Sequence, residues 1–211
     1  MPVALTIDVV GSRRIADRAA AQRHLDAAIA RVTEDVPGVV TPLHPIVGDE
    51  MQGVYADLDS ALSATLLFQL ALPDTVECRF GAGIGEVGVV PSAAGGISDG
   101  PGWWAAREAI DAVERLARRD APSARTRVAA SESAPSDARA GVALANAYLL
   151  SRDELGAAMS ERTRRLTYGR CLGLTQSALA DAEGITQSAV SQALASSGAS
   201  AVVEGFRLLQ S

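Results

Sequence analysis

Asp8 and Asp49 are the residues of this chain whose type and setting best suit metal chemistry. Asp8 lies near the end of an apolar run rich in β-branched residues, 3–10, which predicts a buried strand. An ionised carboxylate in such surroundings is costly unless it has a partner. Asp49 lies with Gly48 and Glu50 in a tight hairpin signal. Because Mg²⁺ favours one or two carboxylates together with substrate phosphates, the two aspartates are candidate magnesium ligands.

A structural interpretation of the same aspartates stays open. Aspartate in a turn is commonly only a turn residue, because its side chain bonds to the nearby backbone. Asp8 and Asp49 would then cap turns and pair with Arg13 or Arg79. The chain has 19 basic residues, all of them arginine, so any step that needs a lysine, such as Schiff-base formation, is excluded.

The elements around these acids follow from the spacing of the apolar residues. Short apolar runs predict strands, and a helical spacing with one charged face predicts helices. In chain order we expect a strand at 3–10, a helix at 17–36, strands at 39–47 and 51–56, a helix at 58–72, strands at 76–82 and 84–90, and a helix at 103–119. The order β-α-β-β-α-β is typical of a ferredoxin-like α+β fold. Its first strand neighbours the hairpin, so Asp8 and Asp49 would converge.

A change of composition divides the chain. Residues 125–130 resemble a last strand, and residues 131–139, rich in Ala and Ser, resemble a linker. At ~100–200 residues per domain, we expect an α+β domain at 1–130 and a helical region at 141–211.

The overall composition predicts a cytoplasmic protein. No apolar run approaches the ~18 residues that span a membrane. Cys78 and Cys171 are far apart and suit reduced core positions in a reducing compartment. The net charge of −6 argues against a protein coated in nucleic acid.

Residues 174–195 predict a helix-turn-helix. Thr175 would cap the first helix, Thr186 the second, and Gly184 stands where the turn needs a positive φ. The side chains expected to face the DNA major groove are Thr186, Gln187, Ser188, Ser191 and Gln192. Because this second helix has no arginine, phosphate contacts would come from Arg162, Arg164, Arg165 and Arg170. DNA binding would then require a homodimer; the alternative is a trihelical module used for dimerisation or packing.

Four segments together resemble the class III nucleotidyl cyclases and their GGDEF relatives: residues 5–11 (LTIDVVG), 46–55 (IVGDEMQGVY), 78–88 (CRFGAGIGEVG) and 100–107 (GPGWWAAR). The resemblance implies a palm-like ferredoxin fold, with Asp8 and Asp49 as metal ligands and Arg107 as a phosphate-stabilising arginine. The further candidate nucleotide-binding residues are Gly48, Glu50, Gly83 and Gly85, although alternating glycines also mark a sharply twisted hairpin. The chain departs from the cyclases at Trp103, where they carry Asn, and from GGDEF at Val47; the purine-selecting lysine is absent.

Taken whole, the chain resembles the SatD family of bacterial cytoplasmic proteins, with I-D-V-V-G-S-R at the opening, then G-D-E, G-I-G and a carboxyl-terminal helix-turn-helix. This resemblance implies a fold and a context rather than an activity. We expect a regulatory protein that binds a Mg²⁺-nucleotide or another phosphorylated ligand in its first domain and DNA through its last helices. The alternatives are a divergent nucleotidyl cyclase or transferase with an accessory helix-turn-helix, and a binding module with neither metal nor DNA.

Two smaller signals accompany these. Trp103 and Trp104 would plug the core under a helix start or, less favoured, stack on a base. An arginine cluster resembles a solvated face that could meet acidic partners or phosphates: Arg115, Arg118, Arg119, Arg125 and Arg127.

Overall fold

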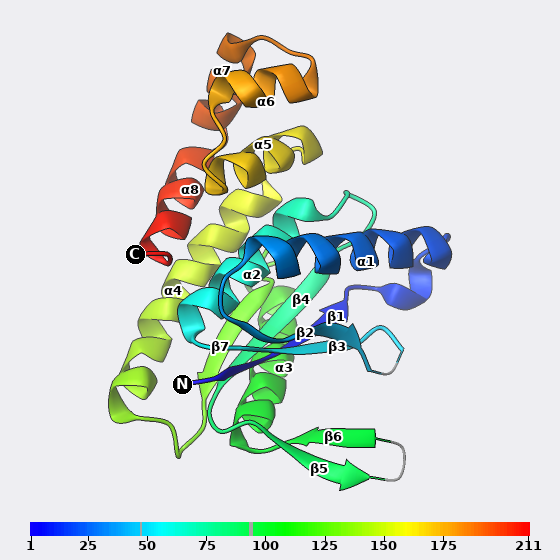
Figure 1. Ribbon diagram of the computed structural model, residues 1–211, viewed down its shortest axis with the longest axis vertical. Coiled ribbons are helices and arrows are strands. Elements are labelled where there is room, and N and C mark those ends of the chain that lie inside the picture. Colours follow the sequence, from blue (N-terminus) through cyan, green and yellow to red (C-terminus); the bar gives the residue numbers. More distant parts are fainter. Residues whose placement is uncertain (47, 93–94) are drawn as a thin grey trace.

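A five-stranded sheet in the order β2-β3-β1-β4-β7 forms the centre of the molecule (Figure 1). The computed structural model describes residues 1–46, 48–92 and 95–211. The strands of this sheet are β1 (Val3–Val9), β2 (Val39–Pro45), β3 (Met51–Tyr55), β4 (Cys78–Ile84) and β7 (Thr126–Ala130). β1 is antiparallel to both of its neighbours, β3 and β4, and β4 is parallel to β7.

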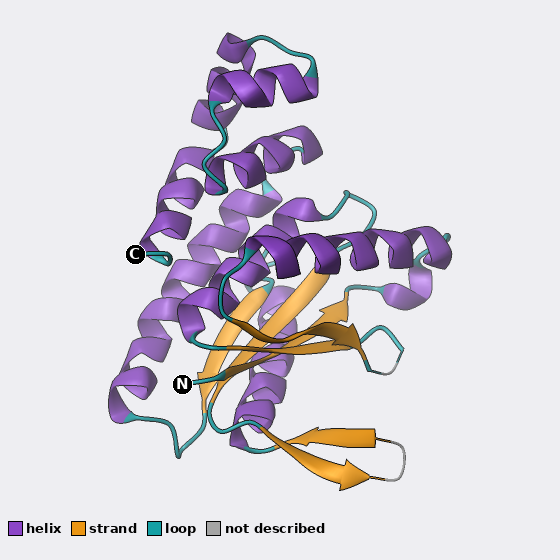
Figure 2. Ribbon diagram, viewed as in Figure 1, coloured by secondary structure: helices purple, strands orange, loops and turns teal. Residues whose placement is uncertain are grey.

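Helices cover both faces of the sheet (Figure 2). On one face, α1 (Arg18–Asp35) and α2 (Leu58–Ala71) bury the odd-numbered residues of β1, including Leu5 and Ile7. On the other face, α3 (Pro101–Arg119) packs against the even-numbered residues, and Trp103 contacts Ala4 there. Because strand side chains alternate between faces, Asp8 lies on the α3 side.

On this face of the sheet, the backbone of α3 lies very close to that of β4. A Cβ added to Gly81 or Gly83 would overlap the backbone of α3, at Ala106 and Gly102 respectively. Glycine at these positions therefore lets the helix lie directly on β4, where any side chain would push it away. The alternating glycines of β4 thus accommodate a helix.

The carboxyl-terminal helices continue the same apolar core. They are α4 (Ser136–Ala157), α5 (Glu161–Cys171), α6 (Gln176–Glu183), α7 (Gln187–Ser196) and α8 (Ala199–Leu208). One buried cluster joins strand residues such as Leu5 to Leu149 of α4 and Phe206 of α8. α5 is also fixed to α1, because the Arg31 guanidinium lies 3.7 Å from the centre of the Tyr168 ring.

α4 also closes the outer edge of the sheet. The side-chain amide of Asn146 accepts from the Val128 N–H at 2.9 Å and donates to the Val128 carbonyl at 3.0 Å. β7 is an edge strand whose backbone groups would otherwise lack a strand partner. At Val128, Asn146 therefore makes the two hydrogen bonds that a neighbouring strand would make.

Most predicted elements appear close to their expected bounds, and the differences have local causes. The predicted strands 76–82 and 84–90 are instead β4 and β5 (Gly88–Ser92), and β5 pairs with a strand that was not predicted, β6 (Gly95–Asp99). Glycine, proline and serine dominate this ribbon, so its sequence carries little strand signal. The predicted linker 131–139 was wrong in its second half, because α4 begins at Ser136. Val47, the predicted end of the second strand, lies outside the described residues.

The predicted caps of the last helices are confirmed. Thr175 and Thr186 accept hydrogen bonds from the N–H groups of Ala178 and Ala189, and Gly184 has a φ of 64°. Among the described helices, none combines the length and the apolar character needed to cross a membrane.

Candidate functional site

An open hollow of about 690 Å³ lies at the end of β1 that carries Asp8. We call it the charged hollow. Its lining comes from the end of β1 and the following loop, the β2–β3 turn, β4, α3 and the segment before β7: Asp8, Val9, Val10, Gly11, Ser12, Arg13, Arg14, Asp49, Arg79, Glu114, Ala117, Arg118, Pro122 and Arg125. Five arginines and three acids thus meet at one place.

The strand order brings the two predicted metal ligands together. β1 lies next to β3, so the turn before β3 reaches the end of β1. Gly48, with a φ of 67°, supports that turn. Asp8 and Asp49 both line the charged hollow, and the charge of Asp49 contributes to raising the pKa of Asp8.

Asp8 is the acid at one end of a chain of ion pairs. The Asp8 Oδ1 accepts from the Arg79 Nε at 2.9 Å, across the β1–β4 register in which the two residues are partners. The Arg79 Nη1 lies 3.0 Å from the Glu114 Oε1, and that oxygen lies 2.7 Å from the Arg118 Nη2. The pairing of Asp8 with Arg79 is the one that the structural interpretation of the sequence foresaw.

Burial sets the electrostatics of Asp8. Burial raises the pKa of this carboxyl above its ordinary value, and the hydrogen bond and charge of Arg79 only partly oppose that effect. The ionised form is therefore held at some cost. A cation bound beside Asp8 would favour that form.

Arg13 and Arg14 supply positive charge that the hollow does not neutralise. Both are exposed, on a loop that turns at Gly11 with a φ of 65°. In the part of the chain that the structure describes, neither lies within ion-pair distance of a carboxylate. The Arg14 guanidinium folds back over Gly11, where an added Cβ would come within 2.9 Å of Nη2. These two cations face the hollow and are available to an anion.

The residues of the hollow fit a magnesium ion that arrives with its ligand. Among the described residues, no group of three His, Cys, Asp or Glu side chains could hold a metal ion. Asp8 and Asp49 supply two carboxylates, and Mg²⁺ is commonly bound by one or two carboxylates plus substrate phosphates. The arginines of the same hollow suit those phosphates.

Arg107 and Glu50 lie outside the lining of the charged hollow and pair with each other. Glu50 also accepts from the Thr6 hydroxyl at 3.2 Å. Gly83 and Gly85 lie under α3, and a Cβ at Gly85 would come within 2.8 Å of the Gly102 nitrogen. In this structure helix backbone therefore covers the open face of both glycines.

The residues predicted to read DNA lie together on α7 or at its cap. Thr186, Gln187, Ser188, Ser191 and Gln192 are all exposed. The arginines expected to contact phosphates have partners within the protein. Arg165 pairs bidentately with Glu183 at 2.7 Å on both nitrogens, and the Nη2 of Arg164 donates to the Leu72 carbonyl at 3.2 Å.

The arginine cluster predicted as a solvated face contributes to the site through Arg118 and Arg125, both of which line the hollow. Glu114 was not anticipated from the sequence. It is one of several charged residues in the regular helix α3, so its residue type and position do not single it out. Trp103 is buried under the start of α3, whereas Trp104 is 64% exposed and donates its indole N–H to Asp99 at 3.0 Å.

Comparison with known proteins gives one family match. The model of the SatD family matches residues 2–204. Among solved structures, the chain is similar to a bacterial light-regulated adenylyl cyclase, with 12% identity and a TM-score of 0.43 over 60% of this chain and 74% of that one. It is also similar to the guanylyl cyclase Cya2, with 15% identity and a TM-score of 0.40 over 53% and 70% of the two chains.

A third similar structure is the adenylyl cyclase CyaB from P. aeruginosa, with 13% identity and a TM-score of 0.36 over 55% of this chain and 69% of that one. All three TM-scores are below 0.5. No curated protein matches the chain in sequence.

Proposed function

The chain belongs to the SatD family, and we propose that this protein binds a Mg²⁺-nucleotide, or a similar phosphorylated ligand with Mg²⁺, in the charged hollow. One observation carries the proposal: Asp8 and Asp49 line the same hollow as Arg13 and Arg14, which have no carboxylate partner among the described residues. Carboxylates for a cation and free guanidinium groups for phosphates are the two halves of such a site.

Each group would have a defined task. Asp8 and Asp49 would hold the ion, and Arg13 and Arg14 would bind phosphate oxygens by charge-assisted hydrogen bonds. Arg79 would keep the Asp8 carboxylate oriented toward the hollow. Bound Mg²⁺ would neutralise phosphate charge.

We also assign the first domain to the ferredoxin-like, palm-like class. The assignment is supported by the strand order β2-β3-β1-β4, in which β1 is central and neighbouring strands are antiparallel. In this class the end of the first strand lies beside the turn of the neighbouring hairpin, which suits a two-aspartate site.

The test is a thermal-shift and calorimetric titration of the full chain with ATP and with inorganic tripolyphosphate, each with and without Mg²⁺. Binding to the folded state alone raises its stability by about 2.7 kcal/mol at a hundredfold excess over Kd. We expect stabilisation that needs Mg²⁺, that is lost in Asp49→Asn, and that weakens about tenfold in Arg13→Gln/Arg14→Gln.

Arg119→Gln is the matched control, because Arg119 is an exposed arginine of α3 outside the lining of the hollow. Its affinity should equal that of the wild type. No binding of either ligand at millimolar concentration, or equal losses in Arg119→Gln, would refute the proposal. Release of pyrophosphate from ATP in the same samples would make the protein an enzyme.

DNA binding by α6 and α7 as a helix-turn-helix is a second proposal, supported by the shared exposure of the five polar residues of α7 and its cap. Residues 174–198 contain two acids, Asp181 and Glu183, and no arginine, so the electrostatic contribution to affinity would be small. Selection from a random duplex pool, followed by anisotropy with Gln187→Ala/Gln192→Ala, tests it. Recovery of no preferred sequence, or equal binding by the variant, would count against it.

A further inference from the structure

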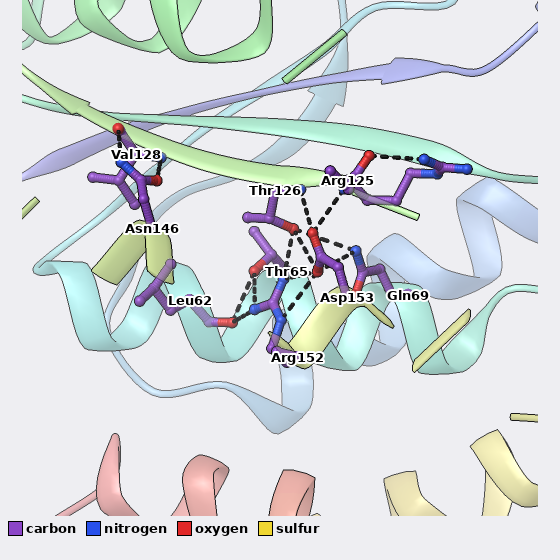
Figure 3. Close-up of polar contacts among 10 residues, drawn as sticks. Leu62, Thr65, Gln69, Arg125, Thr126, Val128, Asn146, Arg152 and Asp153 are labelled. Atoms are coloured by element: carbon purple, nitrogen blue, oxygen red, sulfur yellow. Dashed lines mark hydrogen bonds and ion pairs between the residues drawn. The ribbon is translucent and has the colours of Figure 1, made fainter. Parts of the chain in front are cut away.

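α4 holds the segment that leads into β7 by a single carboxylate. The Oδ2 atom of Asp153 accepts from the backbone N–H of Arg125 at 2.7 Å and from that of Thr126 at 2.6 Å (Figure 3). Asp153 lies seven residues, about two helical turns, after Asn146, which bonds to Val128 further along the same strand. Two side chains of one helix face thus fix the backbone of β7 and its approach.

The second oxygen of Asp153 is satisfied within the core. Its Oδ1 lies 2.9 Å from the Arg152 Nη2. Arg152 also donates to the Thr65 hydroxyl at 3.0 Å and the Leu62 carbonyl at 3.3 Å, both in α2. The side chains of Arg152 and Asp153 are 1% and 0% exposed. A buried ion pair is weak evidence for stability in itself; this one leaves a carboxylate oxygen directed at two neighbouring backbone N–H groups.

One of those two N–H groups belongs to Arg125, the residue that joins this network to the charged hollow. Arg125 lines the hollow, and its guanidinium donates to the Pro122 carbonyl at 2.6 Å and the Ala124 carbonyl at 2.7 Å. Its remaining partner is Glu77, whose side chain is 51% exposed. The Arg125 side chain is only 17% exposed, so water reaches the pair from the Glu77 side, and it is this carboxylate that another anion could replace.

We propose that Asp153 is a positioning residue that fixes the backbone of Arg125, so that its guanidinium can leave Glu77 and bind a phosphate of the ligand. This inference rests on the proposed function, because it assigns Arg125 to the same ligand. Through Asp153, helix α4 would contribute to the binding site. Asp153 would act through Arg125 without touching the ligand.

The test compares two double variants that remove the same buried charges. Arg152→Met/Asp153→Asn keeps a carbonyl oxygen that can accept from the two N–H groups, whereas Arg152→Met/Asp153→Leu does not. With Mg²⁺ and tripolyphosphate as the probe, we expect the Asn form to bind within about twofold of the wild type. The Leu form should bind about tenfold more weakly, as should Arg125→Gln alone. Adding Arg125→Gln to the Leu form should cause no further loss.

Wild-type affinity in the Leu form, or a further tenfold loss on adding Arg125→Gln, would overturn the inference. Amide hydrogen exchange separates this failure from a failure of the proposed function. Exchange at Arg125 and Thr126 should accelerate in the Leu form but not in the Asn form, while Val128, held by Asn146, stays protected. Unchanged exchange at Arg125 and Thr126 would refute positioning even if the wild type binds no ligand.

A measurement on the wild type covers the case in which neither double variant folds. Mg²⁺-tripolyphosphate should slow amide exchange at Arg125 and Thr126, because ligand binding at Arg125 stabilises the segment. Binding without any change at these two amides would overturn the role of Arg125.

Discussion

Two aspartate–arginine pairs in this molecule have the same contact distance and opposite surroundings. Asp8 and Arg79 lie 2.9 Å apart in the charged hollow, with side chains 30% and 13% exposed. Asp153 and Arg152 also lie 2.9 Å apart, but they are buried between α4, α2 and β7. The distance alone therefore says nothing about what a pair does.

The difference lies in how completely each pair is satisfied. Around Asp153, both carboxylate oxygens and the guanidinium have protein partners from three elements (Figure 3). Around Asp8, burial raises the pKa of the carboxyl, and Arg13 and Arg14 nearby have no carboxylate partner among the described residues. The polar groups of the Asp153–Arg152 pair are thus satisfied within the fold. The surroundings of Asp8 could still bind a cation at the carboxylates and an anion at the arginines.

The largest expected effect would come from breaking the buried pair. Asp153→Ala leaves the Arg152 charge and two backbone N–H groups without partners, so we expect the free energy of unfolding to fall by about 3–5 kcal/mol. Asp8→Ala, at a partly exposed pair, should cost about 1 kcal/mol or less. Urea unfolding of both variants measures the contrast. Equal losses would show that the two pairs do not differ as described.

A smaller effect is expected from moving α3, which carries Glu114 to the Asp8–Arg79 pair. Gly83→Ala places a methyl group against the backbone of Gly102, so we expect a loss of about 1–3 kcal/mol from overpacking. The displacement should also weaken ligand binding in the hollow, while amide exchange around Asp153 stays unchanged.

Gly141→Ala is the control for that change. Gly141 lies in α4 with nothing within 4 Å of an added Cβ, so alanine should stabilise the protein by about 0.5–1 kcal/mol. Destabilisation by Gly141→Ala, or none by Gly83→Ala, would contradict the close packing of α3 on β4.

The smallest effect concerns pH. Burial raises the pKa of Asp8 above its ordinary value of 3.8, so the folded protein holds this proton more tightly than the unfolded chain does. Ionisation of Asp8 therefore lowers the free energy of unfolding as the pH rises from about 3.8 through the raised pKa. Asp8→Asn removes this ionisation, so its stability relative to wild type should increase across that window and then level off.

Urea unfolding of both proteins from about pH 3.5 to about pH 7 measures that difference. A relative stability of Asp8→Asn that decreases with pH would show that the attraction of Arg79 outweighs the burial of Asp8.

The sequence predicted the surroundings of Asp8 better than those of Asp153. The apolar run around Asp8 and the turn signal around Asp49 are local, and the predicted strand order suffices to place both at one end of β1. Arg152 and Asp153 form part of an ordinary helical pattern. Their burial depends on how α4 rotates against β7, which no local spacing specifies.

The arginines illustrate the same limit. In the cluster predicted as a solvated face, Arg115, Arg118 and Arg119 are exposed, whereas Arg125 is mostly buried and pairs with Glu77. Arg162, Arg164 and Arg165 were expected to contact DNA phosphates, yet each pairs with an acid of the same chain. An arginine is long enough to reach several partners, so its assignment depends on the tertiary structure.

The hydrogen bonds of Asn146 to Val128 also bear on how the protein behaves at high concentration. An unpaired edge strand is a template on which a second molecule can add its own strand and begin to aggregate. Asn146 occupies that template on β7, and on β2, at the opposite edge of the sheet, Pro42, Pro45 and two register shifts interrupt it. Both edges of the central sheet thus resist intermolecular strand addition, so self-assembly of this protein would proceed through its helices or through the separate β5–β6 ribbon.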